Sequence, residues 1–420
     1  MTISLRRMLG CGLVAFFLGA TGAAWAASTV SLNWDGNPAT LNASFASAQA
    51  AAGDGGRINL AARDYASNQA ITINRQVRIV GLSRDSSIVR RTDAAYGAVF
   101  NVTADNVEFN SLQINGGVIT PRGGTPDRIG VLTNGKSNIK IIGSAVKRVN
   151  YGIFNGAGQR FANLLVSNTH FLENHNYGLW LWSNDSKPQP LTSGRFVFEK
   201  SFIAKDGLMG INVDFGNESG TKLTTVDVSS VVNGVRSYTA ITDNYIDPAR
   251  EFGLAIARAS YITMTGNNVR GGGGLFRADF QAGSKGEYTQ AIHLEDRSSN
   301  LVVRGNTIAN FHNGANGVNL NSAMNVFAVS AARATTNVLV ESNTFVGNTR
   351  WALELHDNRN VTLRNNNFSG ITTSGKKIEA WRGVVNLLVQ GNTALTRSQL
   401  SGSGNSLPEG GSLNTASSFL

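Results

Sequence analysis

Short runs of alternating apolar and polar residues recur along most of the chain, and each leads into a polar corner. Seven segments share the same form, in which a short alternating strand is followed by a polar residue plus Asn and then by a second apolar stretch. They are Leu164–Asn174, Ala240–Arg250, Ile262–Gly271, Leu301–Phe311, Val338–Asn348, Val361–Ile371 and Leu387–Arg397. Alternation at a period of two residues predicts β-strands with one buried face.

The spacing of the corner asparagines predicts a stack of coils. Six of them align, namely Asn244, Asn267, Asn306, Asn343, Asn366 and Asn392, and the gaps between them are 23, 39, 37, 23 and 26 residues. A spacing that never falls below 23 residues indicates one repeating coil with inserted loops, and internal periods of about 20–50 residues are typical of stacked repeats. Asn suits a sharp corner because it tolerates the left-handed conformation, and stacked Asn side chains can form a hydrogen-bonded ladder.

Two other repeat architectures fit the pattern less well. A leucine-rich repeat requires a strict Leu-x-x-Leu-x-Leu frame, which is absent, and a propeller has longer periods with paired hairpins. β-Branched residues, Asn and Gly dominate the strands, and the chain has only 7 prolines. We therefore predict an all-β fold, a single-stranded right-handed parallel β-helix of roughly ten coils.

The ends of the solenoid are predicted to differ. Residues Pro38–Ala52 form the one convincing helix, with Leu41, Phe45 and Ala48 on one face, and we expect it to cap the open N-terminal end. The predicted units are a signal peptide at 1–26, a cap segment at 27–56, the β-helix at 57–395 and a Ser/Gly-rich tail at 396–420.

The first residues have the form of a secretory signal. Arg6 and Arg7 precede an apolar stretch, Met8–Ala20, and a small-residue cleavage site at Ala24–Ala26. The apolar stretch is too short for a transmembrane segment, so we expect export to the periplasm or the exterior of a bacterium. The single cysteine, Cys11, lies inside this signal, so the mature chain would hold neither a disulfide nor a cysteine-bound metal.

The charge balance is basic. The chain has 37 Lys and Arg against 27 Asp and Glu, a formal net charge of +10. This favours a polyanionic partner, which could be an acidic polysaccharide, a nucleic acid or an anionic membrane surface. Because no nucleic-acid module and no long Lys/Arg run is present, we expect the partner to be an acidic polysaccharide and not a nucleic acid. We also expect the chain to be a monomer.

One predicted strand in each coil carries the candidate chemistry. Its first and third positions are mostly Ile, Leu or Val and should face the core, so that the second and fourth positions should face outward. The outward residues, coil after coil, are Phe154, Trp180, Trp182, Asn212, Asp214, Ala255, Ala257, His293, Glu295, Ser330, Ala332, Glu354, His356, Glu379 and Trp381. Coils about 4.8 Å apart would give a row roughly 30 Å long, with Arg258, Arg333 and Arg382 at its strand ends.

This row has the residue types for binding a glycan. The tryptophans offer flat apolar faces to sugar rings, and the arginines could pair with uronate carboxylates. The small outward residues Ala255, Ala257, Ser330 and Ala332 would leave space beside His293 and Glu295 for a ligand ring. Four insertions should rise at the edges of the row, at Asn184–Gly194, Gly216–Arg236, Gly271–Tyr288 and Asn313–Asn325. The remaining histidines, His170, His175 and His312, lie off the row and are expected to be structural.

Three activities remain open. In β-elimination on a uronate, Arg258 or Arg333 would neutralise the carboxylate and His293 or His356 would be the base. Asp214, Glu295 and Glu354 could instead hold Ca²⁺, which takes several oxygen ligands.

Inverting hydrolysis would use Asp214 with Glu295, or Glu295 with Glu354, in each case two coils or roughly 9–10 Å apart. The third possibility is a protein that binds polysaccharide without cleaving it, during export, adhesion or assembly.

The helix cap, the entry strand Gly56–Leu60 and the repeated strand–Gly-Asn–strand coils resemble the pectate-lyase-like right-handed β-helix superfamily over about residues 30–395. The resemblance implies a carbohydrate ligand, with lyase, hydrolase, epimerase or binding activity. The chain lacks the adjacent aspartates with a following Gly-His of polygalacturonases and the Asp-Pro-His-Asp of alginate epimerases. No catalytic residue is therefore carried over from that superfamily.

Overall fold

The computed structural model describes residues 28–93, 95, 97–117, 128–156, 162–182, 196–204, 209–214, 231–232, 235–236, 239–247, 252–271, 290–310, 322–347, 351–372, 376–380, 383–402 and 413–414. The predicted signal peptide and most of the four predicted insertions lie outside these ranges. Within the described ranges no helix is long and apolar enough to cross a lipid bilayer.

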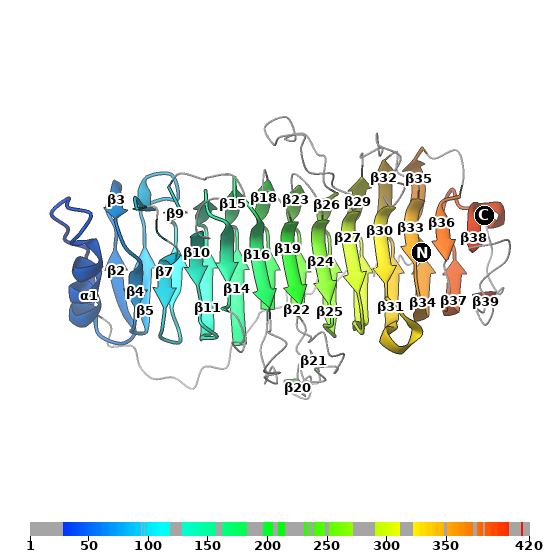
Figure 1. Ribbon diagram of the computed structural model, residues 1–420, viewed down its shortest axis with the longest axis horizontal. Helices are drawn as coiled ribbons and strands as arrows, with labels where there is room; N and C mark the ends of the chain where they lie inside the picture. Colours follow the sequence, from blue (N-terminus) through cyan, green and yellow to red (C-terminus); the bar gives the residue numbers. More distant parts are fainter. Residues whose placement is uncertain are drawn as a thin grey trace, which may run out of the picture.

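Three long parallel sheets, here called A, B and C, run along the molecule (Figure 1). Sheet A contains β1 Thr29–Ser31, β2 Gly56–Asn59, β5 Val77–Val80, β8 Glu108–Asn110, β11 Ser137–Ile142, β14 Ala162–Ser167, β17 Phe196–Glu199, β22 Thr239–Thr242, β25 Ile262–Thr265, β28 Ser299–Arg304, β31 Thr335–Glu341, β34 Asn358–Arg364, β37 Val385–Gln390 and β39 Leu413–Asn414. Sheet B contains β3 Arg63–Ser67, β6 Ser87–Arg91, β9 Gln113–Asn115, β12 Ala145–Lys147, β15 His170–Leu172, β18 Phe202–Ala204, β23 Tyr245–Asp247, β26 Asn268–Arg270, β29 Thr307–Asn310, β32 Thr344–Gly347 and β35 Asn367–Ile371. Sheet C contains β4 Ile71–Ile73, β7 Gly97–Val102, β10 Arg128–Leu132, β13 Tyr151–Phe154, β16 Tyr177–Trp182, β19 Met209–Asp214, β24 Phe252–Ala257, β27 Gln290–Glu295, β30 Ser322–Phe327, β33 Trp351–Leu355, β36 Ile378–Ala380 and β38 Leu400–Gly402.

The chain visits the sheets in the order C, A, B, and each strand pairs with its counterpart one coil away. Sheet B, the smallest, has 11 strands, so the solenoid is slightly longer than the predicted ten coils. The predicted all-β parallel fold is confirmed. One small antiparallel pair, β20 Val231–Val232 with β21 Val235–Arg236, lies within the predicted Gly216–Arg236 insertion.

The corner between sheets A and B is built by a buried ladder of amides. The six corner asparagines are at most 4% exposed, and each of the first five donates from Nδ2 to Oδ1 of the next at 2.9–3.0 Å. Each Oδ1 also accepts the backbone N–H of the corner residue one coil before, which is Ser201 for Asn244 and an Asn for the others, and each Nδ2 donates to a backbone carbonyl. In the earlier coils Ser144, Thr169 and Ser201 occupy this position and also bond the backbone.

The predicted ladder is confirmed, but the reason given for Asn at this corner was wrong. The left-handed residue is the one before each ladder Asn, such as Asp243, Gly266 or Ser342, with φ between 53° and 68° for the six coils. The ladder Asn is selected by its hydrogen bonds. Left-handed asparagines instead form a second, exposed ladder where sheet C leads into sheet A, in which Asn300, Asn337, Asn360 and Asn386 have φ of 55–56°.

Insertions avoid the amide corner. Two residues separate the sheet A strand from the sheet B strand in every coil from β11 to β35. The long gaps between strands all fall on either side of sheet C, for example between β26 and β27 or between β19 and β22. Sheet C is therefore the face beside which this chain places its variable loops.

Both ends are closed by short elements. Helix α1, Leu41–Ala52, starts three residues later than predicted and buries Leu41, Phe45 and Ala48 against the first coil, as expected of a cap. At the other end, part of the predicted tail extends the sheets, because β38 pairs with β36 and β39 pairs with β37. A 3₁₀ turn, η3 Arg397–Gln399, leads into β38.

We predict that Asn343→Ala lowers the free energy of unfolding by about 3 kcal/mol or more, because it leaves several buried groups without hydrogen bonds. Urea titration followed by circular dichroism would measure the loss. The control is Asn337→Gly in the same coil, which removes an exposed ladder amide, keeps the left-handed backbone and should cost at most about 1 kcal/mol. Equal losses would show that burial of the ladder is unimportant.

Candidate functional site on the outer face of sheet C

The strands of sheet C bring one row of outward side chains into register. Each residue is paired with the next across the sheet, in the order Leu132, Phe154, Trp180, Asn212, Ala255, His293, Asn325, Glu354 and Glu379. The residues on either side of this row, such as Ile292, Leu294, Leu353 and Leu355, are fully buried in the core, as predicted. From Phe154 onward, the predicted positions of the outward residues in this row were therefore correct in every strand except β30.

At β30 the predicted register was wrong. The strand is Ser322–Phe327, whereas Ser330 and Ala332 lie in an exposed bend and in the 3₁₀ turn η2, Ala331–Arg333. Asn325 and Phe327 therefore flank His293 and Glu295 on the β30 side, and the predicted small residues Ala255 and Ala257 flank them only on the β24 side. Residues 322–325 had been placed in an insertion because Ala328–Arg333 also alternates between apolar and polar positions.

Aromatic rings dominate the first part of the face. Trp180 stacks on Phe154 and Tyr177 at ring-centroid distances of 4.9 and 5.1 Å, and Tyr151 lies 5.0 Å from Trp180. Trp180 is partly buried in this cluster, and Phe154 is 8% exposed. Trp182 belongs to β16, but its side chain is outside the described part, as are Trp381 and Arg382.

His293 is held on three sides at the middle of the face. Its Nδ1 lies 2.8 Å from Gln290 Oε1, its Nε2 lies 3.2 Å from Glu295 Oε2, and its ring stacks on Phe252 at 4.5 Å. Phe327 lies on the far side at 6.2 Å. The imidazole is thus fixed in place and only partly exposed.

Phe252 and Gln290 were missed by the sequence analysis. Alternation carried back from Ala255 puts Phe252 in the core and Gly253 outside. Gly253 is instead buried, and a Cβ there would lie 2.5 Å from Val269 Cγ1, so the strand bends at this point and Phe252 turns outward. The signal for this bend is the small residue that recurs at the same position of sheet C, as at Gly152, Gly210 and Gly253.

The two described arginines near this site are ion-paired. Arg258 makes a bidentate pair with Asp214, one contact of which is 2.8 Å, although 44 residues separate them. Arg333 Nη1 lies 3.2 Å from Asp296 Oδ2. Both cations nevertheless act on Glu295. Burial raises the pKa of that carboxyl, but the hydrogen bond and charge of His293, with the charges of Arg258 and Arg333, outweigh burial and lower its pKa.

Glu354 and His356 form a second pair farther along the face. Glu354 was predicted to face solvent, but it is only 1% exposed, which corrects that expectation, although it does point away from the core. Its Oε1 lies 3.7 Å from His356 Nε2, and His356 is partly exposed at the end of β33. Phe327 separates the two His–Glu pairs, with its ring 5.2 Å from that of His356.

The carboxylates are not grouped as a calcium site would require. Asp214 is paired with Arg258, and Glu295 and Glu354 are offset both by two coils and by two positions along the strand. Within the described ranges no three acidic, histidine or cysteine side chains converge to hold a metal ion. The residues present do not fit the Ca²⁺ considered from the sequence.

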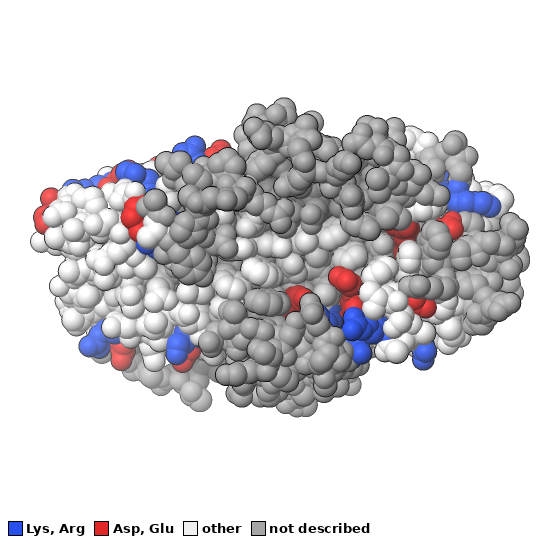
Figure 2. Space-filling model, viewed as in Figure 1, with Lys and Arg blue, Asp and Glu red and all other residues white. Residues whose placement is uncertain are grey.

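Charge is distributed unevenly over the molecule. In the space-filling view, acidic and basic atoms lie together to the right of the centre of the face, and uncharged atoms lie to the left of them (Figure 2). The stacked rings around Trp180 and the charged residues around His293 therefore follow each other along the solenoid axis.

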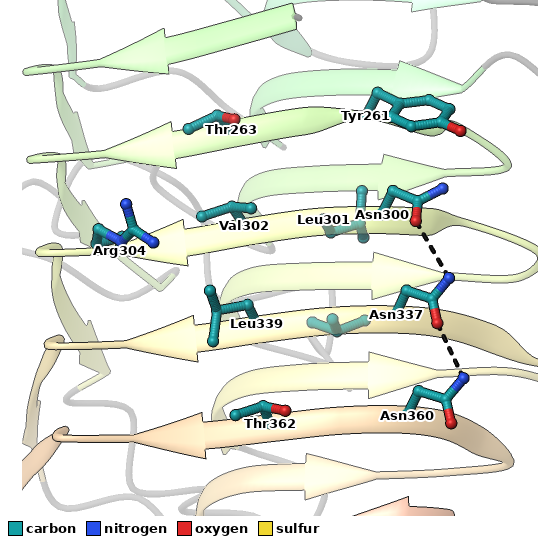
Figure 3. A pocket seen from close by; sticks show the side chains of 11 residues that line it. Tyr261, Thr263, Asn300, Leu301, Val302, Arg304, Asn337, Leu339, Asn360 and Thr362 are labelled. Atoms are coloured by element: carbon teal, nitrogen blue, oxygen red, sulfur yellow. Dashed lines mark hydrogen bonds between the residues drawn. The ribbon is translucent and has the colours of Figure 1, made fainter. Parts of the chain in front are cut away.

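A separate open hollow of about 590 Å³ lies on sheet A, where Tyr261, Val302 and Leu339 line it beside the exposed asparagine ladder (Figure 3). Its amides bond one another from Asn300 to Asn360. It lies on a different sheet from both His–Glu pairs, so Tyr261 offers a control position for tests of sheet C.

Comparison with known proteins supports the architecture. Residues 191–394 match the family model described as a right handed beta helix region. The chain is a right-handed parallel β-helix. No curated protein matches its sequence.

This β-helix is similar to several solved structures. The Streptococcus pneumoniae surface protein and adhesin PfbA is 13% identical with a TM-score of 0.57, over 89% of this chain and 100% of that one. The A-module of the Azotobacter vinelandii mannuronan C-5 epimerase AlgE6 is 13% identical with a TM-score of 0.55, over 85% and 96%. The DFA-IIIase of Arthrobacter chlorophenolicus A6, solved with GF2, is 13% identical with a TM-score of 0.50, over 90% and 92%. At this identity the likeness establishes the fold alone.

The lowered pKa of Glu295 predicts a pH-dependent contribution to stability. The folded β-helix favours the carboxylate, so Glu295 contributes stability above about pH 4.5 that is lost as the pH falls through the lowered pKa. Glu295→Gln should therefore lower the melting temperature at pH 7 and have a smaller effect near pH 3, measured by scanning calorimetry. Asp54→Asn, at a carboxylate that is 65% exposed, should have little effect at either pH.

Proposed function

We propose that the outer face of sheet C binds an extended acidic polysaccharide and cleaves it by β-elimination beside His293. The observation that carries the proposal is the continuous face on which stacked aromatic rings lead into the Phe252–His293–Glu295 cluster. Partly exposed rings on a rigid sheet present apolar surfaces to sugar rings with little loss of side-chain freedom.

His293 is the proposed base. Gln290 Oε1 at Nδ1 and the Glu295 carboxylate at Nε2 both accept hydrogen bonds, so His293 acts as the base once it has released its Nε2 proton to solvent, and Nε2 then takes the proton from the ligand. Arg258 and Arg333 place positive charge beside this point, which would stabilise a uronate carboxylate and the charge that develops on it as the neighbouring C–H bond breaks. Their ion pairs with Asp214 and Asp296 fix the positions of both guanidinium groups.

The site supports inverting hydrolysis less well than the sequence suggested. That reaction needs one protonated carboxyl, whereas Asp214 is paired with an arginine and the pKa of Glu295 is lowered. The pair Glu295 and Glu354 is farther apart than two coils alone would place it, because the two residues also differ in position along the strand.

A second candidate, retaining hydrolysis, is favoured by one observation. Glu354 and Glu379 are in register on the adjacent strands β33 and β36, and both are largely buried. Neighbouring strands lie about 4.8 Å apart, close to the roughly 5–5.5 Å between the carboxyls of retaining glycosidases. Product analysis separates the two reactions.

We also propose that the protein is exported through its N-terminal signal and acts as a monomer in the periplasm or outside the cell. The formal net charge of +10 falls to +8 when Arg6 and Arg7 are removed with the signal, and this basic charge supports attraction to an acidic polymer.

Replacing His293 tests the chemistry. His293→Gln should lower the turnover of a cleaved polyuronate at least about 100-fold, because a general base contributes about that much or more, and should change affinity little. Ultraviolet absorbance of the unsaturated uronate product and calorimetric binding give the two numbers, with His170→Gln on sheet B as the control. New reducing ends without this absorbance would instead assign hydrolysis, and binding of every acidic glycan without either product would assign a binding protein.

Replacing Trp180 tests the binding face. Trp180→Ala should weaken glycan binding about tenfold, through loss of one stacking ring. A modest loss of stability is also expected, because Trp180 packs on Phe154 and Tyr177. Tyr261→Asn, which removes an aromatic ring from the hollow on sheet A at a left-handed position that suits Asn, should leave binding unchanged. Unchanged binding in Trp180→Ala would move the site away from this face.

A further inference from the structure

Beyond the His293 cluster, three consecutive strands present acceptor groups in one row. Asn325, Glu354 and Glu379 are paired in register on β30, β33 and β36. All three point away from the core, since Met324, Val326, Leu353 and Leu355 beside them are fully buried, yet they are only 6%, 1% and 8% exposed. Buried polar groups at this depth require partners.

Asn325 shows that a partner is missing. Its Nδ2 points to Glu354 Oε2 at 3.5 Å, but its buried Oδ1 accepts no hydrogen bond within the described ranges. A buried acceptor without a donor costs about 1–3 kcal/mol. The row therefore calls for a ligand that donates hydrogen bonds.

The charge of the row excludes a carboxylate ligand. The one charged partner of Glu354 within the described ranges is His356, at 3.7 Å, whereas the arginines Arg258 and Arg333 act at the Glu295 end of the face. A uronate placed against Glu354 would bring two carboxylates together in a poorly solvated site, which is strongly unfavourable. The part of the face near Glu295 thus favours a ligand with a carboxylate, and the part near Glu354 favours a ligand without one.

We infer that Asn325 and Glu354 form a subsite for a sugar unit without a carboxylate, which donates hydroxyl or amide hydrogens to Asn325 Oδ1 and to the Glu354 carboxylate. This rests on the proposed function of sheet C. Phe327, between the two His–Glu pairs, supplies an apolar surface that joins this subsite to the uronate position beside His293. The substrate is then an acidic heteropolysaccharide in which a uronate and an uncharged sugar are neighbours, because Asn325 is paired with His293 on the next strand, about 4.8 Å away.

Two tetrasaccharides test the subsite by isothermal titration calorimetry at low ionic strength. One is a homopolymer of uronate, and the other alternates uronate with an N-acetylhexosamine. The wild-type protein should bind the alternating tetramer at least about tenfold more tightly. Glu354→Gln should raise affinity for the homopolymer about tenfold, since the repelling charge is gone.

Glu341→Gln is the matched control. It removes the same charge from sheet A, where Glu341 pairs with Arg304 and Arg364, and should change neither affinity more than twofold. Equal or tighter wild-type binding of the homopolymer overturns the subsite, as does an equal response of the two variants. Since the comparison of ligands uses the wild-type protein, it holds even where Glu354→Gln is unstable. Failure of both tetramers to bind overturns the proposed function as well.

Discussion

The hydrogen bonds between buried corner amides are the constraint on which the rest of this structure depends. Each ladder Asn satisfies backbone groups of two coils at once, so that one coil cannot slide against the next without leaving buried donors and acceptors unpaired. The corner therefore has a constant length and admits no insertion. Variation is confined to the connections on either side of sheet C, and the face with the His–Glu pairs is the one that loops can shape.

Much of this architecture could be predicted because two repeating patterns are present in the sequence. The two-residue alternation in segments such as Val338–Asn348 and the recurrence of Asn determine which side chains are buried and where the coils turn. The role of Asn was misjudged because asparagines form ladders at two different corners, and only those at the corner between sheets C and A use the left-handed conformation. Sequence alone does not separate an amide chosen for its backbone from one chosen for its hydrogen bonds.

The candidate site was less accessible to prediction, for physical reasons that differ between residues. At β30 two adjacent segments alternate equally well, and stacking against β27 and β33 selects Ser322–Phe327. Arg258 and Asp214 are 44 residues apart in sequence, so the sequence could not show that this arginine is held in place by a carboxylate. The two-residue alternation correctly predicted that the Glu354 side chain points away from the core. How deeply that side chain is buried depends on the residues around it and not on its own strand.

The coil between Asn343 and Asn366 has a further consequence. It spans 23 residues and places one strand in each sheet, with its connections to sheet C short on both sides. Such a coil is a self-contained module whose two surfaces match each other, because the same amide ends it above and below. Gene duplication of this segment would lengthen the molecule by one coil without disturbing the neighbouring coils. The number of coils can therefore change during evolution to match the length of a bound polymer.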